Sequence, residues 1–391
     1  MIYKLGDLVE LVTETNSDLK YGLDDIVGVT IEKEMITTIA NLTETDLDKF
    51  VIVRPYDFIY NPRTHGKKIG LGYNTTNRNY IATWNNNVFR VKKNMQNIIL
   101  PDYLYMYFLR ERWDKEACFH SWGSSTVVFL WESFCNMQIN LPSIEEQRKF
   151  VNDYKVITDR IELLNLIDNK LQTYLNFAFS QFLKEYKNES KIVDVNELIE
   201  IQSGLAYDAE FLTENESDNL LISMSNASLG KIFIPNKMKH YSISVDNKYC
   251  GHSGDLFVPT RDLTQACNIL SCPAIIPDYY SDNNIILGTN LYKIEKYFYG
   301  EETKYWLYLL FNSSDYRKYI KECANGSAIL MIKKEDILNY KIAIPNDKDL
   351  FCKFNERVKS LFEIRNAYYS EIQNLLKLKE LILINMGRGV K

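Results

Sequence analysis

The sequence predicts an α+β protein with two tandem mixed α/β domains, each followed by a long helix. An apolar seam with alternating steps of four and three residues runs from Phe150 to Phe182. Adding 204 to its positions gives a second seam, from Phe354 to Met386. Such steps are typical of heptad packing between helices. Because other segments also recur in the same order, we interpret the second half as an internal repeat of the first.

The recurring segments lie upstream of both seams. In each half a glycine precedes a proline by the same 19 positions, Gly123 before Pro142 and Gly326 before Pro345. The other matching pairs are Leu5–Val9 with Val195–Ile199, Asp57–Arg63 with Asp255–Arg261, and Val88–Lys92 with Leu291–Glu295.

Each half is expected to contain strands, a helix, a glycine turn and then the long helix. Residues 5–12 predict a short helix or turn, residues 61–74 a loop, and Pro101–Trp113 a helix with proline in its first turn. A Ser143-x-x-Glu146 capping box predicts the start of the first long helix, which should run to about Lys187. The second half predicts a helix at about Thr303–Asn312. The expected strands of the first half are Ile26–Ile31, Phe50–Val53, Phe58–Tyr60, Tyr80–Thr83 and Val88–Val91.

Composition fits an ordinary soluble globular protein. The chain has 391 residues, 46% of them hydrophobic and 25% charged, which is enough for two or three domains. There is no apolar run long enough for a membrane span, and the start of the chain does not resemble a signal peptide. Seven cysteines without a CxxC pair indicate reduced thiols and a cytoplasmic protein. Cys250 with His252, and Cys267 with Cys272, lack a second pair at zinc spacing, so no metal site is expected.

Local charge points toward DNA although the formal net charge is −5. Between Val51 and Leu100, eight basic residues stand against one acidic residue. Arginine can bind guanine, asparagine can bind adenine, and lysine can bind phosphates. A solvated basic loop without a ligand is the alternative. The candidate DNA-binding residues in this half are Asn61, Arg63, His65, Lys67, Lys68, Tyr73, Asn74 and Arg78.

The second half has a weaker basic segment. Arg261 is its strongest candidate, because it matches Arg63 in the repeat. Lys231, Thr260 and Gln265 are the other candidate DNA-binding residues. For each of these, a loop residue that contacts only water is at least as good an interpretation.

Motifs of catalysis are missing from the sequence. There is no GxxxxGK[ST] loop, no GxGxxG after a strand, and no Asn-Pro-Pro-aromatic motif. Four scattered histidines offer no base near a nucleophile. Glu32-Lys33-Glu34 is too compact for a metal-dependent nuclease and is expected to face solvent. We therefore expect a non-catalytic chain.

Almost the whole chain resembles the specificity (S, or HsdS) subunits of type I restriction–modification systems. The resemblance rests on the alternation of a domain and a long helix, twice, and on two local sequences. Leu141-Pro142-Ser143-Ile144-Glu145-Glu146-Gln147 is similar to the family's proline and Glu-Glu-Gln entry to the first helix, and Gly123-Ser124-Ser125 to the turn before it. In the second half, Ile344–Asp349 departs from this pattern.

The resemblance implies target-recognition domains at 1–141 and 188–344, and conserved spacer helices at 142–187 and 345–391. The helices would form an antiparallel coiled coil, and the halves a pseudo-twofold repeat. The two domains would read a split target in double-stranded DNA. It further implies two methyltransferase and two restriction (translocase–nuclease) subunits as partners. S-adenosylmethionine, ATP and Mg would be bound by those partners, with no cofactor on this chain.

Subunit contacts are expected along the helices, at Glu145, Glu146, Gln147, Ile157, Ile161, Leu164, Leu171, Leu361, Tyr368 and Leu375. Asp168, Arg365 and Lys379 also fall on the seam, where they either fix the helix pairing or lie at its solvent edge. Two other functions remain open. One is a coiled-coil adaptor that does not read DNA, and the other is a nuclease or methyltransferase with its own active site.

Overall fold

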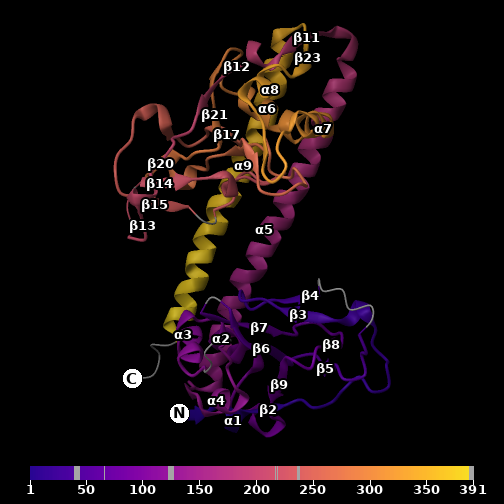
Figure 1. The fold of residues 1–391 in the computed structure, drawn as a ribbon, viewed down its shortest axis with the longest axis vertical. Coiled ribbons are helices and arrows are strands. Elements are labelled where there is room, and N and C mark those ends of the chain that lie inside the picture. The colour runs from indigo at the N-terminus through magenta and orange to yellow at the C-terminus, as the bar shows by residue number, and fades with distance from the viewer. Residues whose placement is uncertain are drawn as a thin grey trace. The chain divides into compact units, whose positions relative to one another are not determined.

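The computed structural model of the chain describes residues 1–38, 45–65, 67–121, 127–215, 217, 219–235 and 238–386 (Figure 1). The architecture is mixed α+β. The chain divides into two compact units: unit 1 comprises Met1–Asp159 with Leu376–Lys391, and unit 2 comprises Arg160–Leu375. No helix in the described ranges is both long enough and apolar enough to cross a membrane.

Two long helices are present where the seams predict them. Helix α5 spans Ile144–Glu185 and helix α9 spans Lys348–Asn385 (Figure 1). The Ser143 hydroxyl accepts a hydrogen bond from the Glu146 N–H at 3.3 Å, and the Glu146 carboxylate accepts one from the Ser143 N–H at 3.0 Å. The predicted capping box therefore starts α5.

The helices run antiparallel within unit 2. Near the end of α5, the Phe182 ring stacks on Phe354 with 4.2 Å between centroids. Earlier in α5, Asp168 contacts Arg365, which comes later in α9. Later residues of α5 therefore contact earlier residues of α9, as antiparallel helices require.

Unit 1 is built on a sheet with strand order β2-β9-β6-β7, and β1 pairs separately with β10. Its core is rich in aromatic rings: Phe58 stacks on Phe89 at 5.0 Å, and Phe108 lies 4.9 Å from Trp113. Each such buried ring contributes roughly 1.5–3 kcal/mol. The other elements of this unit are β1 Ile2–Lys4, α1 Leu5–Leu8, β2 Val9–Leu11, β3 Val27–Val29, β4 Met35–Thr37, β5 Val51–Val53, β6 Phe58–His65, β7 Lys68–Tyr73, β8 Tyr80–Ala82, β9 Asn87–Val91, α2 Pro101–Phe108, α3 Glu111–Phe119, α4 Trp131–Asn136 and β10 Gln138–Asn140.

Unit 2 repeats this plan. Its sheet of order β12-β21-β17-β19 corresponds to β2-β9-β6-β7, and the pair β11–β23 corresponds to β1–β10. A second sheet has the order β13-β15-β14-β20-β16. Its strands β15-β14-β20-β16 correspond to β4-β3 and β8-β5 of unit 1, two pairs that a parallel bridge between Ile26 and Ile81 joins. The elements are β11 Ser190–Asp194, β12 Ile199–Ser203, β13 Leu212–Thr213, β14 Asn219–Ile222, β15 Lys239–Tyr241, β16 Cys250–Gly251, β17 Leu256–Pro259, β18 Arg261–Asp262, β19 Ala274–Ile275, β20 Asn284–Leu287, β21 Leu291–Tyr297, α6 Thr303–Asn312, α7 Ser314–Cys323, β22 Leu330–Met331, α8 Lys334–Leu338 and β23 Lys341–Pro345.

An equivalent ion pair supports the repeat at the level of side chains. In unit 1, Arg90 lies 2.9 Å from Asp57. In unit 2, Lys293 lies 3.3 Å from Asp255. The sequence comparison matched these same segments, so the repeat extends from strand order to individual contacts.

Three expectations are corrected. The predicted loop 61–74 is largely a hairpin, because β6 continues through Arg63 and pairs with β7. The predicted helix 101–113 is two helices, since the chain turns at Leu109 and Arg110 between α2 and α3. Lys33 does not face solvent: its side chain is 3% exposed and lies 2.6 Å from Asp114. The Gly123 turn lies outside the described residues.

Candidate nucleic-acid interface

The β6–β7 hairpin carries exposed positive charge near its tip. Arg63, Lys67 and Lys68 are all exposed. The Asn61 side chain accepts a hydrogen bond from the Arg63 N–H at 2.9 Å, which shapes the backbone before the tip. Lys67 has φ 65°, a left-handed conformation that turns the chain from one strand to the next. The side chain of His65, also a candidate, lies outside what the structure describes.

Other basic residues of this segment are neutralised by acids of unit 1. Arg54 lies 2.6 Å from Glu14, and Arg78 lies 3.1 Å from Asp25. Arg90 pairs with Asp57, as described above. Arg78 remains 67% exposed and stays a candidate. Besides the hairpin cations, Lys93 of this segment is also exposed.

Three candidate side chains are buried and are corrected to structural residues. Tyr73 is 5% exposed and donates a hydrogen bond to Asp102 at 3.2 Å. Asn74 is 0% exposed, donates to the Arg78 carbonyl and accepts from the Thr76 N–H at 3.0 Å. Thr260 is 7% exposed. Because water does not reach these side chains, they are not placed to contact a base.

The second candidate segment begins with Arg261, which is exposed at the start of β18. Gln265 donates a side-chain hydrogen bond to the Ser327 carbonyl at 3.0 Å. This contact joins the loop after β18 to the glycine turn that the sequence singled out. The remaining candidate, Lys231, donates to Asn169 of α5 at 2.7 Å, so its charge is partly engaged within the unit.

Asp262 organises the loop between Gln265 and the next strand. Its carboxylate accepts hydrogen bonds from the Thr264 N–H at 2.8 Å and the Ile269 N–H at 2.9 Å. Burial raises the pKa of Asp262, but these N–H donors outweigh it and hold the pKa below its usual value. The loop is therefore shaped by a charged acceptor at neutral pH.

The helix residues expected at subunit contacts occupy different environments. Glu145 and Glu146 are exposed. Gln147 is 0% exposed and is bonded inside unit 1 to Leu100, Ile98 and Pro142. Its side chain is thus enclosed rather than offered to a partner. Ile157 and Leu164 are buried, whereas Ile161, Leu171, Leu361, Tyr368 and Leu375 are partly buried.

Large apolar side chains also point outward from the long helices. On α5, Val156 is 68% exposed and Phe177 is 60% exposed. They lie off the inner apolar seam, so they are not among the contact residues predicted from the sequence. Leu163, Leu166 and Tyr174 are exposed on the same face of α5 as Phe177, and contiguous apolar surface of this kind often marks a protein-binding site.

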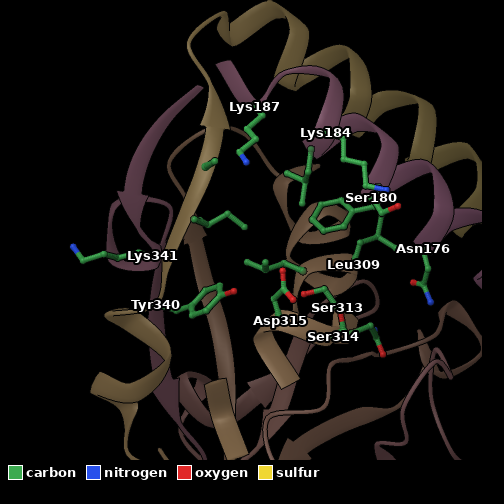
Figure 2. A pocket seen from close by; sticks show the side chains of 16 residues that line it. Asn176, Ser180, Lys184, Lys187, Leu309, Ser313, Ser314, Asp315, Tyr340 and Lys341 are labelled. Atoms are coloured by element: carbon green, nitrogen blue, oxygen red, sulfur yellow. The ribbon is translucent and has the colours of Figure 1, made fainter. Parts of the chain in front are cut away.

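A cavity of about 570 Å³ lies beside the end of α5 in unit 2 (Figure 2). Lys184 near the end of α5, Lys187 just after it, and Ser313 and Asp315 at the start of α7 lie around it. Unit 1 has a cavity of about 530 Å³ beside α9 that includes Glu380 and Leu383, the repeat equivalents of Asn176 and Phe179 in the first cavity. The same hollow thus recurs at the same place in the repeat.

Comparison with known proteins gives a consistent family. No protein-family model matches the chain. A curated relative, the "Type I restriction enzyme MjaVIII specificity subunit" of Methanocaldococcus jannaschii, is 27% identical over 320 residues, which cover 75% of this chain and 71% of that protein. The chain is thus similar to a type I specificity subunit over three quarters of its length. Specificity subunits are the non-catalytic subunits of type I systems.

The fold agrees with that of one solved specificity subunit. The crystal structure of the type I S subunit from M. genitalium matches with a TM-score of 0.56 at 13% identity, covering 99% of this chain and 95% of that one. The HsdS subunit from Thermoanaerobacter tengcongensis matches with a TM-score of 0.38 at 15% identity, covering 100% of this chain and 96% of the other, a similarity too low to support an argument. The resemblance stated from the sequence is confirmed.

Proposed function

We propose that this chain is the DNA-recognition subunit of a type I restriction–modification complex and reads a bipartite target. The observation that carries the proposal is the repeated sheet, followed each time by a long helix, in a chain that is similar to a specificity subunit. Domains 1–141 and 188–344 would each read one half of the target. The segments 142–187 and 345–391 would act as spacer helices between the two readings.

The first half-site would be read by the β6–β7 hairpin. A two-stranded ribbon fits the major groove of B-DNA, where arginine can bind guanine by two hydrogen bonds. Lys67 and Lys68 at the tip supply charge for phosphates. In the second domain Arg261 and Gln265 take the corresponding places.

The long helices would set the spacing of the half-sites. An α-helix of 42 residues, such as α5, is about 63 Å long, and one turn of DNA rises about 34 Å. A rigid antiparallel pair would hold the two readings at one separation. The target would then contain a fixed number of unread base pairs.

Partner subunits would supply the chemistry. Two methyltransferase subunits would bind along the outward apolar side chains of the helices and beside the two equivalent cavities, one subunit for each half of the repeat. Two restriction subunits would join this complex in the cytoplasm. S-adenosylmethionine, ATP and Mg would be bound by these partners, and adenine methylation or cleavage would be directed by this chain.

DNA binding by the reconstituted complex with its methyltransferase tests this proposal. We expect the charge reversals Lys67→Glu and Lys68→Glu together to weaken DNA binding by tenfold or more and to lower its salt dependence. Subunit assembly should be unchanged. The matched control is Lys20→Glu with Lys49→Glu, an equal charge change at two exposed lysines of unit 1. A complex that assembles but never binds DNA would instead favour the structural adaptor.

A further inference from the structure

Two short helices present a similar pair of neighbouring residues at equivalent places in the repeat. Helix α3 carries Trp113-Asp114, and helix α7 carries Tyr316-Arg317. The two pairs are 203 positions apart, as are the glycines and prolines of the repeat. Trp113 is 1% exposed and Tyr316 is 0% exposed. The aromatic residue is thus a core residue in both units, and the charged residue after it differs in sign.

In unit 1 the charged residue holds the hairpin. The Asp114 carboxylate accepts hydrogen bonds from the Ile69 N–H at 3.0 Å and from Lys33 Nζ at 2.6 Å. Lys33 Nζ also donates to the Ile69 carbonyl at 2.6 Å. Both backbone polar groups of Ile69 are therefore bound by side chains from outside the hairpin, immediately after the basic tip.

The contact between Lys33 and Asp114 in unit 1 is a buried ion pair. Lys33 and Asp114 have side chains that are 3% and 8% exposed, and the Lys33 ammonium lies 5.2 Å from the centre of the Trp113 ring. Burial lowers the pKa of Lys33, while its bond to Asp114 opposes that shift. Removing either residue leaves a buried charge without its partner, so a substitution at either position is expected to be strongly destabilising.

In unit 2 the charged residue holds the loop after β18. Arg317 donates to the carbonyls of Leu270 at 2.6 Å and Cys267 at 2.8 Å. The hydroxyl of Tyr316 is hydrogen-bonded to that of Ser271 at 2.7 Å. Cys267 and Ser271 have φ 57° and 53°, and left-handed backbone of this kind needs such outside contacts to persist.

Asp114 and Arg317 have opposite charges, yet each binds the backbone of a segment next to the proposed DNA-reading cations. Asp114, a carboxylate, meets an N–H group and a lysine, whereas Arg317, a guanidinium, meets carbonyl groups. Each residue suits the backbone groups that face it. In both cases the bound segment adjoins the cations proposed to read DNA, Lys67 and Lys68 in one unit and Arg261 in the other.

We infer that Asp114 and Arg317 are equivalent positioning residues, each of which sets the sequence preference of one half-site by fixing the segment that reads it. This inference rests on the proposed function. Neither residue needs to contact DNA. A small displacement of the hairpin or of the loop would move the cations off their base edges, because base recognition depends on bidentate geometry.

The test is to map N6-methyladenine in cells that carry the chain with its methyltransferase, using Asp114→Ala and Arg317→Ala. We expect each variant to relax one half-site only, a different one for each variant. Single-base variants of that half-site should become methylated about tenfold more often relative to the wild-type site. The conservative variants Asp114→Asn and Arg317→Lys should restore part of the preference, and they keep the test available if an alanine variant does not fold.

Controls separate positioning from stability. Gln147→Ala in unit 1 and Val358→Ala in unit 2 remove buried groups away from the reading segments, and should lower methylation without changing the motif. Unchanged motifs in the Asp114 and Arg317 variants, or a loss of methylation with the motif intact, would overturn the inference. If the wild-type chain directs no split motif at all, it is the proposed function that fails.

Discussion

Arg365 on α9 forms a bidentate ion pair with Asp168 on α5, at 2.6 Å through Nε and 3.2 Å through Nη2. The arginine is 1% exposed. It also donates to the Gly230 carbonyl at 2.9 Å and is hydrogen-bonded to Gln172. One side chain therefore ties both long helices to a loop of the second domain.

This pair breaks the repeat. The positions equivalent to Asp168 and Arg365 are Ile372 and Ile161, both apolar. A buried polar pair in a mostly apolar seam favours one register, since a shifted pairing buries an unpaired charge. For Asp168 and Arg365, the structure favours the interpretation in which these seam residues fix helix pairing.

Arg365→Met should lower the free energy of unfolding by about 3–5 kcal/mol, because Asp168 would stay near the core without its partner. The matched control is Arg160→Gln, which breaks the Arg160–Glu371 pair on the same helices. Its side chains are 46% and 39% exposed, so we expect a loss below about 1 kcal/mol. Denaturant unfolding measures both. Equal losses in the free energy of unfolding would show that the buried pair contributes no more to stability than the exposed pair.

Gln147→Ala should destabilise unit 1 by about 2–4 kcal/mol. The amide of Gln147 satisfies the Leu100 N–H at 3.0 Å and the Ile98 carbonyl at 2.8 Å, and both would lose a buried partner. Glu145→Gln, at an exposed neighbour, should change stability by less than about 0.5 kcal/mol. Thermal unfolding compares the two. A neutral Gln147→Ala would mean that water replaces the side chain.

Gly326→Ala should distort the turn that receives Gln265. Gly326 has φ 122°, and an added Cβ would lie 2.1 Å from the Ile329 carbonyl oxygen. Left-handed backbone of this kind costs a residue other than glycine about 1–3 kcal/mol, before any clash. Gly28→Ala, where a Cβ meets nothing within 4 Å, is the control and should be nearly neutral. Circular dichroism melts would show the difference, and equal melts would contradict the required turn.

Phe177→Glu should weaken binding of the methyltransferase subunit while leaving the chain folded. Phe177 is 60% exposed on α5, so a charge there costs little in the free chain but is buried in the proposed complex. Phe119→Glu is the control, since Phe119 is 82% exposed on α3. Size-exclusion chromatography of the mixed subunits reports assembly. Full assembly of the Phe177 variant would place the partner elsewhere.

The sequence predicted the long helices well, because a seam of many turns is a strong periodic signal and the Ser143–Glu146 capping box is local. Helix α6 matches its predicted range, Thr303–Asn312. The hairpin was missed because Gly70, Gly72 and several polar residues between Asn61 and Asn74 resemble a loop. Only pairing across the sheet decides that they are strands.

The candidate site was predicted in part. Exposed charge at Lys67 and Lys68 follows from composition, but burial of Tyr73 and Asn74 depends on neighbours far along the chain. Lys33 was expected to face solvent because two glutamates flank it. Its partner Asp114 lies 81 residues away, a distance at which sequence periodicity gives no signal. Trp113-Asp114 and Tyr316-Arg317 lie 203 positions apart, the offset of the repeat, but they were not matched from the sequence.

The most direct measurement is a genome-wide map of N6-methyladenine in cells that carry this chain with its methyltransferase, compared with cells from which only this chain is deleted. The proposed function predicts a split motif with a fixed spacer that disappears with the deletion. Unchanged methylation, with the protein expressed and folded, would contradict it.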